Sequence, residues 1–315
     1  MTTIFANRAC GILYRILKAI DTSLPFLLPA NVCPVVPLTF LSAGIKFKFI
    51  DINPNTLCID EAMCINEIRT KQYAGLMFIR TYGYVYDTTD FFREIKTIDK
   101  SILIIDDRCL SIPSFYYDDN NADIQLYSTG YAKYVNLGKY GFAHIKEDRM
   151  ANAACHIDEI SFNEAIDIDK MYKEKEKAGE IIENPIEGWL DVGLMPNEEQ
   201  KTYIVKVVNS IQKINNHKKD INSIYLESLS HLALPQCFND WRFNIRVRQK
   251  ESMLSRIFEK GLFASSHYKP VNKIFGDSQE MPISTQLYEE VINLFNDNYF
   301  SLQQATEITN LINKL

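Results

Sequence analysis

The sequence has 315 residues, of which 46% are hydrophobic, and its formal net charge is −6, from 34 Lys and Arg against 40 Asp and Glu. This length predicts one large domain plus a smaller one, with enough apolar residues for a sizeable core. Because no tract of basic residues occurs, we do not expect the chain to bind nucleic acid or an anionic membrane surface.

The seven cysteines are scattered along the chain, which indicates reduced thiols in a cytoplasmic protein and not a disulfide framework. Cys58 and Cys64 have no matching second pair, so no zinc or other metal site is predicted. The N-terminal segment lacks the charged region, apolar stretch and cleavage site of a signal peptide. Because no apolar run reaches about 18 residues, no membrane-spanning helix is expected.

The first half of the sequence alternates apolar runs with helical patterns. Apolar residues at helical spacing predict a helix over residues 8–20, with Asn7 as its N-cap. Short runs rich in Ile, Val and Phe predict strands at 25–30, 47–52, 75–83, 101–107, 124–128 and 141–145. The helical segments between them include 34–43, 60–71 and 87–99. Since several strands are apolar at nearly every position, we expect a mostly parallel sheet with helices on both faces.

The pattern changes after about residue 150. Residues 164–183 are charged and helical, and residues 183–199 contain two prolines and two glycines and are predicted to form a loop. A long amphipathic helix is predicted at about 197–228. A small α/β unit over 241–315 is then expected to consist of a strand at 241–247, a helix at 250–261, a turn at 265–276 and two terminal helices.

Polar residues at the carboxyl ends of the predicted strands are the first candidates for ligand binding, because ligands of open parallel sheets bind beyond these ends. Asp106 and Asp107 end one strand, and Tyr82 ends another. Ser128 ends a third, with Lys133 just beyond it. Adjacent carboxylates on a strand point to opposite faces, so only one of the two aspartates is expected to face a ligand.

Lys133 is a single cation among tyrosines and small residues. A loop lysine is most often simply solvated, but an apolar and aromatic setting is a poor place for an idle charge. Desolvation or a cationic neighbour would lower the lysine pKa from roughly 10.4 and release a nucleophilic amine. The lysine is therefore a candidate for covalent chemistry.

Other residues carry weaker signals. Cys33 and Cys109 are more often small buried hydrophobes than nucleophiles. His267 lies in a turn and is the histidine most expected to line a site. The helix start at Asn7 and Arg8 favours a phosphate, because its free N–H groups and dipole attract anions. The absence of a P-loop and of G-x-G-x-x-G argues against phosphoryl transfer and a Rossmann dinucleotide site.

Five segments of the chain carry motifs that follow one another in a familiar order and spacing. "YSTGYAKYVNLGKYG" (127–141) has its lysine five residues after a serine and five before a glycine. "IIDDRCLS" (104–111) ends a strand in an aspartate motif, and "FIRTYGYVYD" (78–87) carries a tyrosine and a glycine. Together with 28–60 and 242–270, these segments resemble the fold-type I pyridoxal-phosphate (PLP) enzymes, most closely the sugar aminotransferase family called DegT/DnrJ/EryC1/StrS.

The resemblance implies a fold. It predicts an α/β protein whose large domain has a mostly parallel, seven-stranded sheet flanked by helices, followed by a smaller C-terminal α/β domain. The expected bounds are 1–200 for the large PLP-binding domain and 201–315 for a linking helix with the small domain. Because family members are dimers with sites at the subunit boundary, a homodimer is also expected.

The resemblance also implies a role for each motif residue. Lys133 would form the internal aldimine with the cofactor. Asp107 would keep the pyridine nitrogen protonated, so that the ring can take up carbanion charge. The residues expected at the cofactor phosphate are Ser128, Asn7, Arg8 and Ala9. Those expected around the ring or the substrate are Cys33, Leu110, Tyr82, His267 and Tyr268.

The implied function is a ping-pong transamination. Glutamate would donate its amino group to the cofactor, with Lys133 moving the proton, and a nucleotide-linked keto-sugar would then accept the amino group. The alternative is a degenerate family member with a non-catalytic binding or regulatory role. The retained Lys133 and Asp107 oppose that alternative.

Departures from the family pattern favour the alternative. Leu110 stands where the family has Gln or His, and Lys139 and Tyr140 interrupt its glycine-rich G-E-G-G. Residues 192–195 lack the Asn and Arg of the segment that reaches the partner's cofactor. The chain also begins at the phosphate-binding helix, without the segment that usually precedes it and helps to cover the substrate. These changes are expected to affect substrate identity most.

Overall fold

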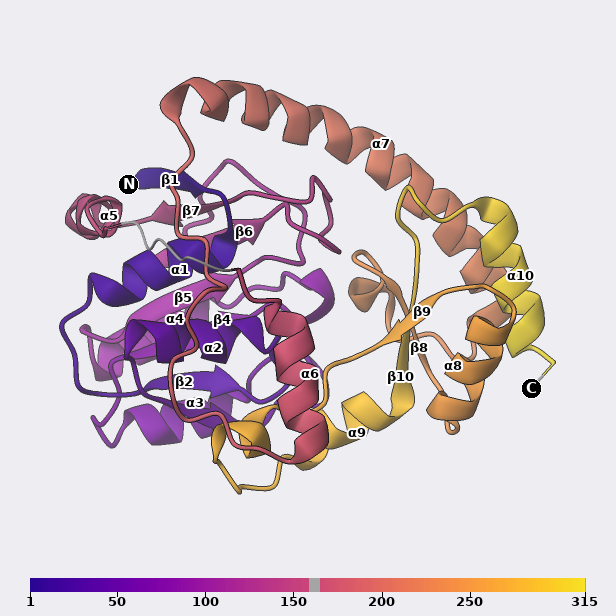
Figure 1. The fold of residues 1–315 in the computed structure, drawn as a ribbon, viewed down its shortest axis with the longest axis horizontal. Coiled ribbons are helices and arrows are strands. Elements are labelled where there is room, and N and C mark those ends of the chain that lie inside the picture. The colour runs from indigo at the N-terminus through magenta and orange to yellow at the C-terminus, as the bar shows by residue number, and fades with distance from the viewer. Residues whose placement is uncertain (159–164, 315) are drawn as a thin grey trace.

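The computed structural model describes residues 1–158 and 165–314, which form two sheets joined by a long helix (Figure 1). The larger sheet has seven strands in the order β1-β7-β6-β5-β4-β2-β3. Their bounds are β1 Thr2–Ala6, β2 Phe26–Pro29, β3 Phe47–Ile50, β4 Gly75–Ile79, β5 Leu103–Asp107, β6 Ile124–Ser128 and β7 Gly141–Ile145. All neighbours from β6 to β3 are parallel, and β7 runs antiparallel to β1 and β6. The predicted mostly parallel, seven-stranded sheet is confirmed.

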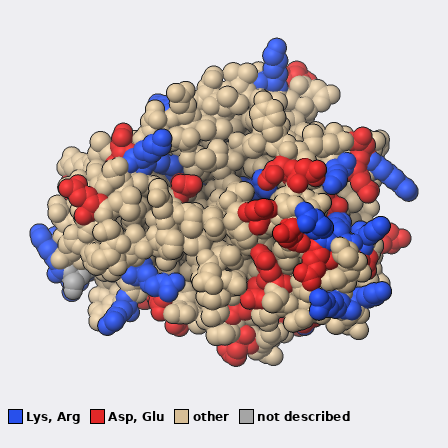
Figure 2. All heavy atoms as spheres, turned by 180° about the vertical axis from the view of Figure 1, so that it is seen from behind, with Lys and Arg blue, Asp and Glu red and all other residues tan. Residues whose placement is uncertain are grey.

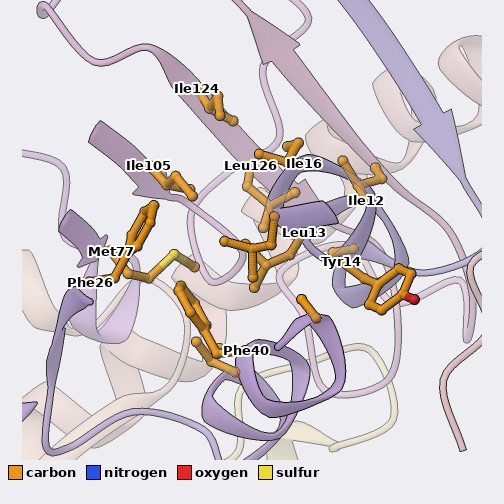
Figure 3. Close-up of a cluster of buried hydrophobic side chains, with 14 of the residues drawn as sticks. Ile12, Leu13, Tyr14, Ile16, Phe26, Phe40, Met77, Ile105, Ile124 and Leu126 are labelled. Carbon is orange, nitrogen blue, oxygen red and sulfur yellow. The ribbon is translucent and has the colours of Figure 1, made fainter. Parts of the chain in front are cut away.

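Helices cover both faces of this sheet. The helices α1 (Ala9–Lys18), α2 (Val35–Ala43) and α5 (Asp148–Cys155) share one core with the strands, and Figure 3 shows part of it. The helices α3 (Glu61–Ile68) and α4 (Thr89–Ile98) pack on the opposite face. Alternation along β5 separates the two cores, because Ile105 points into the first and Ile104 into the second. Strands buried on both faces explain the nearly continuous apolar runs in the sequence.

The N-terminal strand β1 was not predicted from the sequence. It pairs with β7 along its whole length, from Thr2 opposite Ile145 to Ala6 opposite Gly141. Its last three residues are buried, and its first two, both threonines, are half-exposed at the edge of the sheet. An apolar run of three residues is too short to indicate a strand by itself.

The helix that follows starts differently from the prediction. It begins at Ala9, its N-cap is Arg8, and no side chain caps it by a hydrogen bond, so the assignment of Asn7 as N-cap is wrong. The Asn7 side chain instead donates to Asp191 Oδ1 at 3.2 Å, and its backbone N–H donates to Gly193 O at 2.9 Å. Asn7 therefore fastens the segment around residue 193 beside β1, and the first turn of α1 keeps its N–H groups free of side-chain caps.

The second half of the chain builds the smaller sheet, in the order β8-β10-β9 with antiparallel pairing. Its elements are β8 Phe243–Arg246, α8 Lys250–Glu259, β9 Ala264–Ser266, α9 Pro282–Glu290, β10 Val291–Leu294 and α10 Leu302–Ile312. Residues 265–276 were expected to form a turn, and two terminal helices were expected without a strand before them; β9 and β10 correct these predictions. The β10 run is buried at every position between β8 and β9, so sheet packing decides its conformation.

The connection between the two sheets contains α6 (Ile168–Ala178) and the 33-residue helix α7 (Asn197–Leu229), which crosses the top of Figure 1. The helix α6 falls within the predicted 164–183, and α7 ends one residue beyond the predicted 197–228. Residue 164, where the first segment was predicted to start, lies outside the described residues. The predicted domain boundary at residue 200 falls in the first turn of α7 and stays a prediction.

The helices and the surface charge can be compared with the expectation of no membrane-spanning helix and no basic surface. None of the described helices combines the length and apolar composition that crossing a bilayer requires. On the face shown in Figure 2, charged side chains of both signs are interspersed, and the upper part of that face carries few of them. That face therefore presents no continuous positive field.

Candidate active site

A cleft lies where the carboxyl ends of the central parallel strands meet the smaller sheet. Residues directly after β2, β4, β5 and β6 line one side of it, and Trp241, His267 and Tyr268 line the other. The rule that ligands bind beyond the strand ends points to the edge of the sheet at which this cleft lies. Of the residues predicted for the site, the cleft is lined by Cys33, Asp107, Leu110, Lys133, His267 and Tyr268.

Asp107 presents its carboxylate to the cleft from the end of β5. It is 7% exposed, and its Oδ1 accepts a hydrogen bond from the Cys109 N–H at 2.8 Å. Burial raises the pKa of Asp107 above its ordinary value, although the Cys109 hydrogen bond and the ammonium group of Lys133 oppose the shift. A buried carboxylate held in this way binds a proton, or a protonated nitrogen, more readily than one in water does.

Asp106, the preceding residue, points to the other face of β5. It accepts hydrogen bonds from Arg80 Nε at 2.7 Å, Arg108 Nε at 2.8 Å and Asn120 Nδ2 at 2.9 Å, and it is fully buried. Burial opposes its ionisation, but the two guanidinium groups outweigh that cost and hold the pKa of Asp106 below its ordinary value. The expectation that only one aspartate faces the cleft agrees with this geometry.

Lys133 stands in the cleft on the loop that joins β6 to β7. The loop is closed at its base, because Leu137 N donates to Thr129 O at 2.8 Å and Thr129 N donates to Tyr140 O at 3.0 Å. The residue before the lysine, Ala132, has φ +56°, in the left-handed region that non-glycine residues rarely adopt. Lys133 is half-buried and close enough to Asp107 for its charge to act on that carboxyl.

Of the residues predicted to hold a phosphate, Arg8, Ala9 and Ser128 gather beside the cleft, although they do not line it, whereas the side chain and the backbone N–H of Asn7 donate to residues 191 and 193. A side-chain carbon placed on Gly130 would lie 3.4 Å from Ser128 Oγ and 3.9 Å from Arg8 Nη1. The Arg8 guanidinium lies 5.8 Å from the ring centre of Tyr131, which does line the cleft. The uncapped N-terminus of α1 at Ala9 completes this group of donors.

Close approach of β7 to the start of α1 explains one glycine of the motif. A Cβ on Gly141 would lie 2.7 Å from Ala9 N and 2.8 Å from Ala9 Cα, which is closer than atoms can pack. Gly141 therefore lets the first N–H groups of α1 sit at this edge of the sheet.

His267 reaches the cleft from the smaller sheet. Its Nε2–H donates to the backbone oxygen of Asn31 at 3.2 Å, and burial lowers the pKa of His267 to about 4. The imidazole is therefore neutral near pH 7 and joins the two walls of the cleft. Tyr268 is 45% exposed at the rim.

Tyr82 does not lie where a substrate could touch it, which corrects its assignment as a substrate-binding residue. It is fully buried, with its ring 5.1 Å from that of His267 and stacked on that of Trp241. It ends no strand, because β4 stops at Ile79 and the chain turns through Tyr82 at φ +55°. Tyr82 therefore supports the wall of the cleft from behind.

Asn31 and Trp241 are among the lining residues that the sequence did not predict. Asn31 directly follows the predicted strand at 25–30, so the strand-end rule could have found it; its Oδ1 is buried without a hydrogen-bond partner among the described residues. Trp241 comes from the start of the small α/β unit, where no pattern indicates a contact with the loop that carries Lys133. Its Nε1–H donates to Ala132 O at 2.7 Å.

A second hollow, of about 780 Å³, opens on the smaller sheet and is lined in part by Arg246, Arg248 and Glu290. Arg246 Nε lies 3.4 Å from Glu290 Oε2, so its charge is already partnered. None of the residues predicted to bind the cofactor or the substrate lines this hollow.

The cleft fits PLP by the chemistry of its groups. A buried carboxylate with a raised pKa, Asp107, suits a pyridinium nitrogen, and Lys133 supplies the amine that an aldehyde requires. The uncapped start of α1 with Arg8 and Ser128 supplies donors for a phosphate at one end. Fold and cleft together define the class of fold-type I PLP enzymes.

Comparisons with known proteins agree with this class. A family model described as the DegT/DnrJ/EryC1/StrS aminotransferase family matches residues 36–313. The chain therefore belongs to the DegT/DnrJ/EryC1/StrS aminotransferase family, which confirms the predicted family, the PLP-dependent aminotransferase class and the cofactor. A search of curated proteins finds no match.

Three solved structures of similar fold illustrate the relationship. The sugar aminotransferase CalS13 from Micromonospora echinospora is 13% identical with a TM-score of 0.75, covering 99% of this chain and 87% of its own. DesI, solved in the presence of its TDP-sugar product, is 12% identical with a TM-score of 0.77, covering 99% and 80%. NtdA from Bacillus subtilis, with bound PMP, is 17% identical with a TM-score of 0.73, covering 100% and 74%.

Proposed function

We propose that this protein transfers the amino group of glutamate to a nucleotide-linked keto-sugar. The observation that carries the proposal is the meeting of Lys133 and Asp107 in one cleft at the carboxyl edge of a parallel sheet. PLP, when bound, supplies an electron sink for the carbanion that transamination requires. Membership of an aminotransferase family supports the reaction type.

Each residue of the cleft has a defined task in this proposal. Lys133 Nζ would hold the cofactor covalently and, once released, would move a proton between the amino-acid carbon and the cofactor carbon. Asp107 would present its buried carboxylate to the pyridine nitrogen, and this negative charge would favour the protonated form of that nitrogen. Arg8, Ser128 and the start of α1 hold the phosphate. Neutral His267 keeps the small-domain wall closed against Asn31.

The acceptor and the donor are the finer parts of the proposal. A nucleotide-linked sugar is supported by DesI, whose fold this chain shares and which was solved with its TDP-sugar product. Glutamate is supported only by the resemblance of the motifs. The seven free thiols are consistent with the proposed cytoplasmic location, where disulfides are rare.

We also propose a homodimer. Large apolar side chains stand exposed near the cleft, with Tyr131 71%, Val85 44% and Ile112 41% exposed. Apolar side chains grouped at a surface favour an interface. Sedimentation of the PLP-loaded protein at several concentrations tests this point, and a single species with the mass of one chain would contradict it.

The test of the proposed function is covalent trapping. Borohydride added to the PLP-loaded protein should fix the cofactor on Lys133, located by peptide mapping. Lys133→Ala should abolish the label, while Lys139→Ala, an exposed lysine on the same loop, should leave it intact. A label on another residue, or an unlabelled protein, would refute the proposal.

A non-catalytic role is the second candidate, because Leu110 puts an apolar side chain in the cleft where the family has Gln or His. The two candidates differ in their response to glutamate. An aminotransferase converts bound PLP to PMP, with a change in absorbance, whereas a binding protein keeps the PLP spectrum when glutamate is added.

A further inference from the structure

The turn that carries Lys133 needs support from outside itself. Ala132 adopts a left-handed conformation at φ +56° and is itself exposed. An L-residue other than glycine pays an energetic cost there, so such a conformation persists only where the surroundings impose it. The position of the lysine amine therefore depends on whatever holds the Ala132 peptide.

Trp241 makes that contact from the other side of the cleft. Its indole Nε1–H donates to Ala132 O at 2.7 Å. The indole is held flat against the Tyr82 ring, with 6.1 Å between ring centres and 9° between planes. Because Tyr82 is fully buried, the stack fixes the direction in which the indole N–H points.

The backbone of Trp241 is fixed as well. Lys218, on α7, donates from Nζ to Trp241 O at 2.8 Å and to Asn296 Oδ1 at 2.7 Å. Asn296 follows β10 and is fully buried, and Lys218 is 4% exposed. The tryptophan thus projects from a packed part of the smaller sheet, and the hydrogen bond to Ala132 crosses from that sheet to the larger one.

We propose that Trp241 is a positioning residue that holds the left-handed Ala132 turn and thereby sets where the Lys133 amine lies in the cleft. The indole N–H fixes the carbonyl on the peptide that joins Ala132 to Lys133. Without this hydrogen bond the turn relaxes toward ordinary backbone conformations, and the amine samples positions away from Asp107. The catalytic consequence rests on the proposed function, but the mechanical one does not.

The test uses Trp241→Phe, which removes the donor and makes the side chain smaller but keeps an aromatic ring beside Tyr82. The control is Trp189→Phe, a change at the other tryptophan of the chain, whose buried Nε1 has no partner among the described residues. Both variants are first compared with wild type by circular dichroism. Acetic anhydride then labels the cofactor-free proteins, and mass spectrometry gives the labelling rate of Lys133 relative to exposed Lys139.

In Trp241→Phe, the rate ratio of Lys133 to Lys139 should rise about fivefold, the factor by which loss of one internal hydrogen bond typically shifts an equilibrium. Hydrogen exchange of peptide 128–137 should accelerate while that of β5 does not. Trp189→Phe should leave both measurements at the wild-type value. An unchanged ratio in Trp241→Phe, or an equal change in Trp189→Phe, overturns the proposal.

The same variant also separates this inference from the proposed function. In PLP-loaded protein, Trp241→Phe should weaken cofactor binding about fivefold and slow borohydride trapping at Lys133. If the wild-type protein takes no cofactor at Lys133 while the labelling ratio still rises, the proposed function fails and the positioning role of Trp241 stands. If the wild-type protein binds the cofactor at Lys133 but the labelling ratio does not change in Trp241→Phe, the proposed function stands and the positioning role of Trp241 fails.

Discussion

The two faces at the end of β5 differ in how they treat a buried carboxylate. On one face, Asp106 is fully enclosed by Arg80, Arg108 and Asn120, and its charge is neutralised. On the other face, Asp107 receives one backbone hydrogen bond at 2.8 Å and looks into the cleft. Their pKa values accordingly move in opposite directions, down for Asp106 and up for Asp107.

The difference separates stability from function within two residues. A carboxyl whose pKa is lowered on folding adds stability above its unfolded pKa of about 3.8, and that stability is lost as pH falls through the folded pKa. A carboxyl whose pKa is raised does the reverse, and its contribution is lost as pH rises through the folded pKa. At neutral pH, ionised Asp106 therefore raises the free energy of unfolding, and ionised Asp107, whose carboxylate faces the cleft, lowers it.

The largest effect is expected from Asp106→Asn. This change leaves two buried guanidinium groups without their shared carboxylate and should lower the free energy of unfolding by about 3–5 kcal/mol. Urea denaturation of the cofactor-free protein measures it. The control is Asp118→Asn, which removes a half-exposed partner of Arg108 and should cost about 1 kcal/mol or less. Equal losses in both variants would contradict the comparison.

Asp107→Asn should show the opposite pattern. The amide keeps an oxygen for the Cys109 N–H but cannot hold a proton on a pyridine nitrogen. The rate of the glutamate half-reaction should fall about 10²-fold or more, as when a preorganised electrostatic group is removed from an active site. The free energy of unfolding of the cofactor-free variant should stay level or rise. A variant that is destabilised yet active would reverse the roles assigned to the two aspartates.

Acid titration extends the comparison to the other wall of the cleft. The pKa of His267 is lowered from 6.5 to about 4 by burial, so the unfolded chain takes up a proton before the folded one does. Stability from neutral His267 is therefore complete above pH 6.5 and declines toward pH 4, by about 3 kcal/mol in all. His267→Gln should lack this component. Parallel stability curves for wild type and variant over this range would rule it out.

The smallest effect is expected at the phosphate end. Gly141→Ala puts a methyl group 2.7 Å from Ala9 N, so the start of α1 must shift. Overpacking of this kind costs about 1–3 kcal/mol. Affinity for PLP should fall about tenfold, or 1.4 kcal/mol, while affinity for pyridoxal, which lacks the phosphate, should change less. An equal loss for both ligands would place the effect elsewhere than at α1.

The large sheet and the cofactor side of the cleft could be predicted because their signals are local. Buried parallel strands are apolar at nearly every position, and Asp107 and Lys133 stand in motifs at strand ends. The strands β1 and β10 could not be predicted, because pairing with distant strands, and not their own pattern, decides their conformation.

The far wall of the cleft follows the same logic. The contact between Trp241 and Ala132 joins residues 109 positions apart across two sheets, and no residue pattern in a single sequence encodes it. The prediction that Tyr82 binds the substrate was wrong for a related reason. The chain leaves β4 earlier than its apolar run suggests and turns the tyrosine inward.

The helix α7 has a mechanical consequence. At 1.5 Å per residue its 33 residues form a strut about 50 Å long. It is tied to the lysine loop where Asn215 Oδ1 accepts from Tyr134 OH, and to the smaller sheet through Lys218 and Trp241. These ties lie three residues apart on one rigid body. A displacement of this part of α7 would therefore shift both supports of the loop that carries Lys133 together.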